Sequence, residues 1–252
     1  MAMFALMSPG GSPGVTTTAL ATTYVWEGRA LLAECDPQGG SVLPGFLAGN
    51  MDGHEYGLLE LALAAAHHSD PAIVWKHVIA LDQEARKWLL LPGLRDPRHL
   101  VQLEGAWETV AGVLMAAQEK VDVVVDVGQV GRSDTPMSLI AACDVAVMLV
   151  RPTLRHVVQA RPRLDALGRR VGTDVSVGLC TVGGGPYTSQ EVSKALFDLP
   201  VLAQIPDDWR AAMVLSDGVP ARKSFHRSGL LRGASRLGAA MRSHLEKKVT
   251  AP

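Results

Sequence analysis

Short apolar runs alternate along this chain with segments whose apolar residues recur at helical spacing. The apolar runs predict strands over Phe4–Met7, Ala30–Ala33, Val121–Val125, Val145–Val150, Val175–Cys180 and Val201–Gln204. The helical segments are Thr17–Tyr24, Leu58–His67, Pro97–Glu119, Leu154–Arg169, Ser189–Phe197 and Ser228–Lys247. Nearly continuous apolar strands separated by helices are typical of a parallel sheet that is covered on both faces. We therefore expect an α/β fold with a doubly wound, mostly parallel sheet, in one domain over residues 1–252.

The stretch from 73 to 91 departs from this alternation. Its pattern is compatible with two short strands, His77–Leu81 and Lys87–Leu91, joined by a turn at Asp82–Arg86. No internal repeat and no low-complexity linker interrupts the sequence, which favours a single domain.

Composition narrows the class of protein. The chain has 252 residues, of which 48% are hydrophobic, so it can bury a sizeable core. Its formal net charge of −1 gives no global attraction to nucleic acid or anionic membranes. The three cysteines (Cys35, Cys143 and Cys180) have no metal-binding spacing and are expected to be buried thiols. No apolar run is long enough to span a bilayer, and no basic segment precedes the first apolar run, so we expect a cytoplasmic protein without a signal peptide.

A glycine-rich stretch, residues 8–18, follows the first predicted strand and leads into a predicted helix. Strand, glycine loop and helix are the arrangement in which backbone N–H groups cradle a phosphate. The usual pattern is G-x-x-x-x-G-K-[ST]. When Gly14 is taken as its second glycine and Thr16 as its hydroxyl residue, Val15 occupies the lysine position and Pro9 the first glycine position.

Polar residues also follow the other predicted strands. Glu34 to Gly40 comes after the second strand, and Asp126 to Arg132 comes after the run that ends at Val125. Ligands of such sheets bind at the carboxyl ends of the strands. A glycine loop beside Asp36 and Asp126 is what a magnesium–nucleotide site requires, because Mg²⁺ prefers oxygen ligands. Without a metal, these two carboxylates would repel each other and raise the pKa of one of them; alternatively, they cap nearby helices or loops.

The loop, together with Asp36-Pro37-Gln38-Gly39 and Val123-Val124-Val125-Asp126, resembles the ParA/MinD family of deviant Walker-A P-loop ATPases. The resemblance covers nearly the whole chain, because Val150-Arg151-Pro152-Thr153 and Pro206-Asp207 also fit in order. The loop is most similar to an actinobacterial-type branch that reads G-S-P-G-V-T-T, matched here by residues 11–17. Related atypical members are the CpaE/TadZ proteins, which localise pilus and secretion machinery.

This resemblance implies roles for individual residues. Thr16 matches the magnesium-binding threonine, Asp126 the Walker-B carboxylate, and Asp36 the aspartate associated with the attacking water; these three would hold the metal. Glu34 stands where many members have another aspartate. The residues implied in nucleotide binding are Gly10, Gly11, Ser12, Gly14, Val15, Thr16 and Thr17 in the loop, with Gly183, Pro206 and Asp207 near the base. The implied cofactors are ATP and Mg²⁺.

Both lysines of the family's loop are replaced. The signature lysine falls on Gly10 and the phosphate-binding lysine on Val15, and neither residue carries a charge. One hypothesis is therefore a pseudo-ATPase scaffold. It would position a membrane-associated, secretion or pilus-type assembly, or cell-pole machinery. It would act through a partner protein or as a homodimer. A second is an active ATPase in which Arg132 or Arg151 supplies the missing cation; the alternative for both arginines is a solvated or Asp-paired surface position. A third is a DNA-partition protein.

The C-terminal segment 222–248 is basic and amphipathic. Leu230, Ala234, Leu237, Met241 and Leu245 form one apolar stripe, with arginines off it. This pattern fits a helix that contacts the inner face of the membrane or non-specific DNA. It fits equally a terminal helix whose stripe packs on the sheet, and the sequence leaves both interpretations open.

Overall fold

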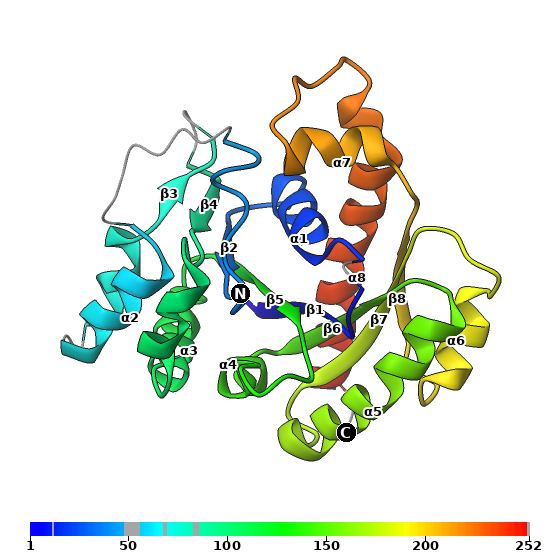
Figure 1. Cartoon of the computed structure of the whole chain (residues 1–252), viewed down its shortest axis with the longest axis horizontal. Helices are drawn as coiled ribbons and strands as arrows, with labels where there is room; N and C mark the ends of the chain where they lie inside the picture. The colour runs from blue at the N-terminus through cyan, green and yellow to red at the C-terminus, as the bar shows by residue number, and fades with distance from the viewer. Residues whose placement is uncertain (12, 48–55, 68–69, 83–85, 251–252) are drawn as a thin grey trace.

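The computed structural model describes residues 1–11, 13–47, 56–67, 70–82 and 86–250. Their strands form one eight-stranded sheet in the order β3-β4-β2-β5-β1-β6-β7-β8. The strands are β1 (Met3–Ser8), β2 (Ala30–Glu34), β3 (Ile79–Ala80), β4 (Trp88–Leu91), β5 (Asp122–Gln129), β6 (Val145–Val150), β7 (Ser176–Val182) and β8 (Val201–Ile205). Every pair is parallel except β3 with β4. This architecture confirms the predicted doubly wound sheet (Figure 1). The two short strands that the sequence allowed in 73–91 are present as β3 and β4, and the structure adds that they pair antiparallel at the edge of the sheet; residues 83–85 of the turn between them lie outside the described residues.

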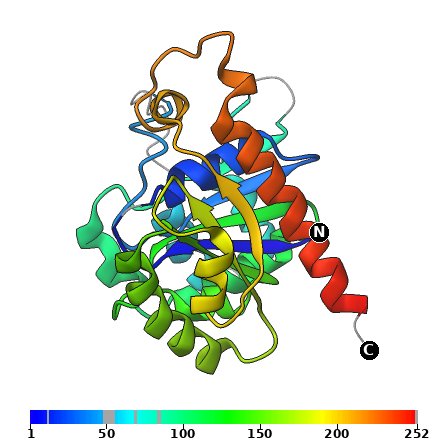
Figure 2. The same ribbon diagram turned by 90° about the vertical axis from the view of Figure 1, so that its right-hand side faces the viewer.

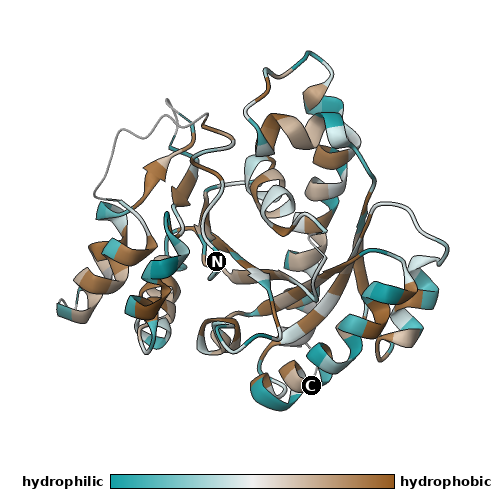
Figure 3. Ribbon diagram, viewed as in Figure 1, coloured by the Kyte–Doolittle hydropathy of each residue, from teal (hydrophilic) through white to brown (hydrophobic). Residues whose placement is uncertain are grey.

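The central strand β1 shows why the sheet is buried on both faces. Met3, Ala5 and Met7 enter one hydrophobic layer, whereas Phe4 and Leu6 enter the other. Successive side chains of a strand point to opposite faces, so an uninterrupted apolar run is buried only when helices cover both of them. Figure 3 shows the apolar strands between the two sets of helices.

The helices divide between the two faces of the sheet (Figure 1). One face carries α1 (Val15–Tyr24), α7 (Trp209–Ser216) and α8 (Gly229–Thr250). The other carries α2 (Leu58–His67), α3 (Trp107–Ala117), α4 (Met137–Ala141), α5 (Leu154–Val171) and α6 (Ser189–Ala195). Short 3₁₀ helices are η1 (Pro71–Lys76), η2 (Pro97–Leu103) and η3 (Phe225–Arg227).

Three local predictions differ from the structure. The predicted helix 97–119 is divided into η2 and α3, and Gly105 lies between them with a φ of 81°. Strand β5 continues to Gln129, so Asp126 lies within a strand and not after it. Helices α4 and α7 have no counterpart among the predicted elements. The signal for α7 is Asp208, whose side chain accepts a hydrogen bond from the backbone N–H of Ala211 as an N-cap.

The C-terminal helix packs its apolar stripe on the sheet. Leu230, Ala234, Leu237 and Met241 are buried in the same layer as α1. Figure 2 shows α8 running along the side of the sheet. Off the stripe, the guanidinium of Arg242 donates to Asp122 at 3.0 Å. The stripe therefore packs on the sheet, which is one of the two arrangements that the sequence left open.

The segment 222–248 that was predicted as one unit begins before the helix. Residues 222–228 form a turn and η3, and α8 starts at Gly229. Within the described part of the chain, every helix is too short or too polar to span a bilayer.

Candidate functional site

The glycine loop begins where β1 ends at Ser8, and it ends where α1 begins at Val15. Gly10, Gly11 and Gly14 have φ values of 141°, 68° and 93°, which side-chain-bearing residues rarely adopt. Gly14 is the N-cap of α1, and no side chain caps that helix. The first N–H groups of α1 are therefore free to bind an anion. Ser12, predicted to belong to the same loop, lies outside the described residues.

A cavity of about 300 Å³ opens on this loop. Its lining residues are Ser8, Gly14, Val15, Thr16, Thr17, Asp36, Gln38, Gly128 and Gln129. The structure thus brings the loop together with the ends of β2 and β5, as the sequence predicted. Asp36 is the only charged residue in this described lining. The described residues that line the cavity supply carboxylate and hydroxyl oxygens and no cationic side chain.

Asp126 lies next to Thr16 and is almost completely buried, with 1% of its surface exposed. Its carboxylate accepts hydrogen bonds from the Thr16 side chain and, at 2.9 Å, from the backbone N–H of Gly128. Burial raises the pKa of Asp126 to about 7, the Thr16 hydrogen bond opposes this rise, and the nearby charges of Asp36 and Glu34 add to it. The pKa of Asp126 rises as predicted, although burial contributes more than repulsion does.

Asp36 approaches Asp126 across Gly128. A Cβ atom added to Gly128 would lie 2.0 Å from the Asp36 carboxylate, so that carboxylate packs directly against the glycine. It also accepts a hydrogen bond of 2.8 Å from the backbone N–H of Gln38. Burial raises the pKa of Asp36, the hydrogen bond from Gln38 opposes this rise, and the charges of Asp134 and Arg132 act in opposite directions. Gly128, whose lack of a side chain permits this approach, was not predicted as a site residue.

The two candidate cations are both paired with carboxylates. Arg132 donates to Asp134 at 3.1 Å, and Arg151 to Asp207 at 3.4 Å. Neither arginine belongs to the described lining of the loop cavity. Their placement matches the Asp-paired alternative that the sequence left open.

The residues expected near a nucleotide base gather at the ends of β6, β7 and β8. The backbone N–H of Gly184, next to Gly183, donates to Asp207 at 3.3 Å, and Pro206 directly follows β8. A Cβ atom on Gly183 would lie 2.7 Å from the Asp207 carboxylate. Gly183, Pro206 and Asp207 therefore form a second cluster, which contributes no residue to the described lining of the loop cavity.

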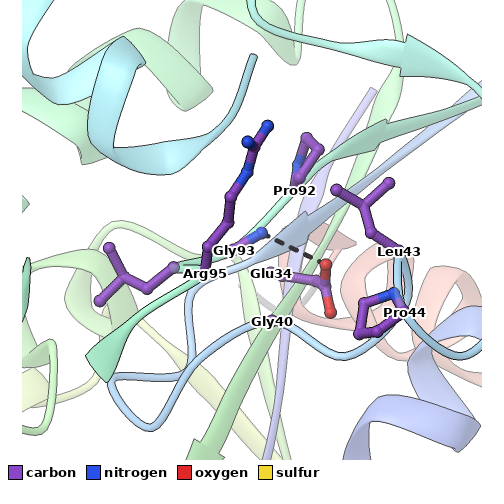
Figure 4. Close-up of a pocket in the computed structure, with 8 residues that line it drawn as sticks. Glu34, Gly40, Leu43, Pro44, Pro92, Gly93 and Arg95 are labelled. Atoms are coloured by element: carbon purple, nitrogen blue, oxygen red, sulfur yellow. Dashed lines mark hydrogen bonds between the residues drawn. The ribbon is translucent and has the colours of Figure 1, made fainter. Parts of the chain in front are cut away.

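Glu34 has a structural environment distinct from that of the two aspartates. It is 2% exposed and accepts backbone hydrogen bonds from Ser41, Val42 and Gly93 at 2.7, 3.0 and 3.2 Å. Figure 4 shows its carboxylate beside Gly93 in a separate cavity of about 230 Å³. Burial raises the pKa of Glu34, and the three N–H donors oppose that rise. Glu34 ties the segment after β2 to the segment after β4.

His156 and Gln159, on α5, lie beneath the loop and were missed from the sequence. A Cβ atom on Gly11 would lie 2.8 Å from His156 Nε2, and one on Gly10 would lie 3.4 Å from Gln159 Oε1. His156 Nδ1 accepts from the backbone N–H of Arg151 at 3.3 Å. At Gly10, where the resemblance places the signature lysine, the amide ends of Gln129 and Gln159 lie close, and the φ of 141° disfavours any residue with a side chain. The sequence feature that could have indicated where His156 and Gln159 lie is Thr153, the N-cap at which α5 begins shortly after β6.

The oxygen donors fit a magnesium ion only in part. Among the described residues, no group of three or more His, Cys, Asp or Glu side chains is placed to hold a metal by itself. Mg²⁺ is commonly held by one or two carboxylates with phosphate oxygens and waters, which Asp36, Asp126 and the Thr16 hydroxyl match. The phosphate side of the site fits less well, because the described lining of the loop cavity contains no lysine or arginine.

The fold is that of ParA and MinD ATPases. No protein-family model matches the sequence, and no curated protein does. MinD of Pyrococcus horikoshii, solved with Mg-ADP, has a TM-score of 0.72 at 15% identity and covers 99% of both chains. A ParA family ATPase of Chlorobium tepidum has a TM-score of 0.66 at 20% identity, over 98% of this chain and 96% of that one. A chain of the MinC:MinD complex of Aquifex aeolicus is similar to this chain with a TM-score of 0.67 at 12% identity, and the match covers 96% of each of the two chains.

Proposed function

We propose that this chain is a ParA/MinD-like pseudo-ATPase that acts as a scaffold or positioning factor for a protein assembly. The observation that carries the proposal is the loop cavity, whose described lining contains Asp36 and no lysine or arginine. A phosphate bound there would meet backbone N–H groups and carboxylates without a side-chain cation. The fold matches that of ParA and MinD ATPases, whereas the described part of the cavity supplies no lysine or arginine for phosphoryl transfer.

The expected cost in rate of losing both lysines favours a chain that does not turn over ATP. In phosphoryl transfer the protein contributes mainly positioning and stabilisation of charge. Losing one preorganised donor of this kind typically costs about 10²- to 10³-fold in rate. Here Val15 occupies the phosphate-lysine position and Gly10 the signature position. Pro13 also removes one backbone donor from the loop.

If ATP and Mg²⁺ bind, the residues that would receive them are those of the candidate site. Thr16, Asp36 and Asp126 would hold the metal, and the loop from Gly10 to Thr17 would hold the phosphates. Gly183, Pro206 and Asp207 would lie near the base. The metal would neutralise the two neighbouring carboxylates and bring positive charge to the phosphates.

The proposed partner is a protein. The Aquifex neighbour was solved as a complex of MinD with MinC, which supports partner binding by a protein of this fold. We assign the chain to a degenerate, CpaE/TadZ-like branch that serves membrane-associated, secretion or pilus-type machinery, or a partition assembly. A homodimer through the loop face belongs to the same proposal.

The alternative function is an active ATPase with a rewired site. One observation bears on it: the charge of Arg132 reaches Asp36 and lowers its pKa, although Asp134, the ion-pair partner of Arg132, raises that pKa by more. In this alternative, Arg132 or Arg151 would leave its aspartate partner when nucleotide binds. A DNA-partition role would instead use Arg232 and Arg236, which are exposed on α8.

A phosphate-release assay separates the scaffold from the ATPase. We expect the purified chain to release phosphate from Mg-ATP no faster than its Asp126→Asn variant, which lacks a metal-binding carboxylate. Turnover that exceeds this control and falls in Arg132→Ala or Arg151→Ala would establish the rewired enzyme. Turnover that both arginine variants retain would reject the pseudo-ATPase and the arginine mechanism together.

A further inference from the structure

A groove of about 430 Å³ lies beside α7, and its described lining includes none of the predicted site residues. Its walls are α7 and the segment 217–228, which leads from α7 to α8 and forms the upper part of Figure 1. Asp208 connects the start of α7 to the start of α8. Its carboxylate accepts from the backbone N–H of Ala211 at 3.2 Å and from that of Gly229 at 2.8 Å.

The groove presents apolar side chains to solvent. Trp209 is 64% exposed, Met213 36% and Val219 38%, and all three line it. Phe225 is buried at its base. Large apolar side chains that gather on one surface commonly mark an interaction site, whereas single ones do not.

Three arginines surround this apolar centre. Arg210, Arg222 and Arg227 line the groove, and none forms an ion pair with a described residue. Asp208 is the only acidic residue in the described lining, and its carboxylate is occupied by backbone N–H groups. The guanidinium of Arg210 lies 5.2 Å from the centre of the Trp209 ring. Within the described lining, three arginines therefore stand against one aspartate, and the groove carries a net positive charge.

We propose that this groove docks an acidic segment of a partner protein, with apolar side chains of that segment entering between α7 and the segment 217–228. Carboxylates beside the apolar anchors would pair with Arg210, Arg222 and Arg227. Arginine clusters recognise acidic motifs in this way, and an amphipathic helix places its anchors into an apolar groove. The aliphatic wall formed by Met213, Val214 and Val219 suits such anchors better than stacked nucleic-acid bases.

The proposal does not depend on nucleotide, so it can succeed or fail separately from the pseudo-ATPase. The test is selection of a phage-displayed random-peptide library on the immobilised full chain, followed by fluorescence anisotropy with the enriched peptides. The groove variant is Arg222→Glu with Arg227→Glu. Its matched control is Arg29→Glu with Arg155→Glu, which changes the net charge equally at exposed arginines outside the groove. Trp209→Ala tests the apolar anchor, and thermal melting confirms that every variant is folded.

We expect enriched peptides that combine acidic with large apolar residues. Their affinity should fall by about tenfold or more in the groove variant and in Trp209→Ala, and stay unchanged in the control. The absence of any enriched acidic peptide, or equal loss of binding in the control, would overturn the proposal. Binding of single-stranded DNA that is lost in the groove variant alone would also overturn it and assign the groove to nucleic acid.

Discussion

Glu34 and Asp126 are in-register neighbours on the parallel strands β2 and β5, and both carboxylates are buried. Their hydrogen bonding differs. Glu34 accepts from three backbone N–H groups, whereas Asp126 accepts from one, at Gly128, and from the side chain of Thr16. Two acids at the same level of one sheet thus have different roles. Glu34 holds two chain segments together, and Asp126 lies beside the cavity where a cation would satisfy it.

The difference shows how to recognise a carboxylate that is available to a ligand. A buried carboxylate is costly unless hydrogen bonds or a cation compensate for its charge. Backbone donors provide much of that compensation at Glu34, so its burial requires no ligand. Burial raises the pKa of both carboxyls, but Asp126 has only one backbone donor and the Thr16 side chain to oppose the rise, and its pKa reaches about 7. Altered pKa values of this kind gather at functional sites.

The largest expected effect is a pH-dependent stabilisation by Asp126→Asn. The folded-state pKa of Asp126 is about 7 against an ordinary 3.8, so its contribution to stability is fully present below pH 3.8 and is lost as the pH rises to about 7. An asparagine does not ionise, so the variant does not lose this stability at high pH. The difference in the free energy of unfolding amounts to about 4 kcal/mol for a change of about three in the pKa. Urea unfolding from pH 4 to pH 8 measures it.

In that experiment the variant should gain stability over the wild type steadily as the pH rises. A constant difference across the whole range would contradict the assignment of a raised pKa to Asp126. Addition of Mg²⁺ to the wild type at pH 8 should reduce the difference if Asp126 binds the ion, since binding to the folded state alone stabilises it.

Glu34→Ala should destabilise the protein by a somewhat smaller amount. The substitution leaves the backbone N–H groups of Ser41, Val42 and Gly93 without their acceptor, and each buried unsatisfied donor costs about 1 kcal/mol or more. We therefore expect a loss of about 3 kcal/mol in the free energy of unfolding at pH 7, measured by urea denaturation. Glu34→Gln is the matched control, because its amide oxygen still accepts. Equal stability of the wild type and the alanine variant would show that Glu34 is not the anchor we describe.

The smallest of these effects is expected for Asp36→Asn. The charge of Asp36 raises the pKa of Asp126 but ranks after burial among the causes. Its removal should therefore lower the pKa of Asp126 slightly, and the carboxyl carbon of Asp126 can be followed by NMR titration. An unchanged titration midpoint would mean that the two carboxylates are not electrostatically coupled.

The sequence predicted the sheet and most of the site for a physical reason. Residues at the ends of neighbouring parallel strands share one edge, so a glycine loop, Asp36 and Asp126 could be placed together from the strand pattern alone. The partners of Glu34 could not be predicted, because Gly93 lies far along the chain and donates through its backbone. His156 was missed because its position under Gly11 depends on how α5 packs against the loop. Gly128 was missed for a similar reason, since only the structure shows that Asp36 rests on it.

Calorimetric titration of ATP with Mg²⁺ into the full chain and into its Val15→Lys variant tests the central claim most directly. The claim is that the loop lacks the cation a phosphate requires, so the wild type should show no magnesium-dependent micromolar affinity. The variant restores a charge-assisted hydrogen bond worth about 1.5–3 kcal/mol, which should tighten binding by roughly 10- to 100-fold. Magnesium-dependent micromolar affinity in the wild type, with no gain in the variant, would contradict the account.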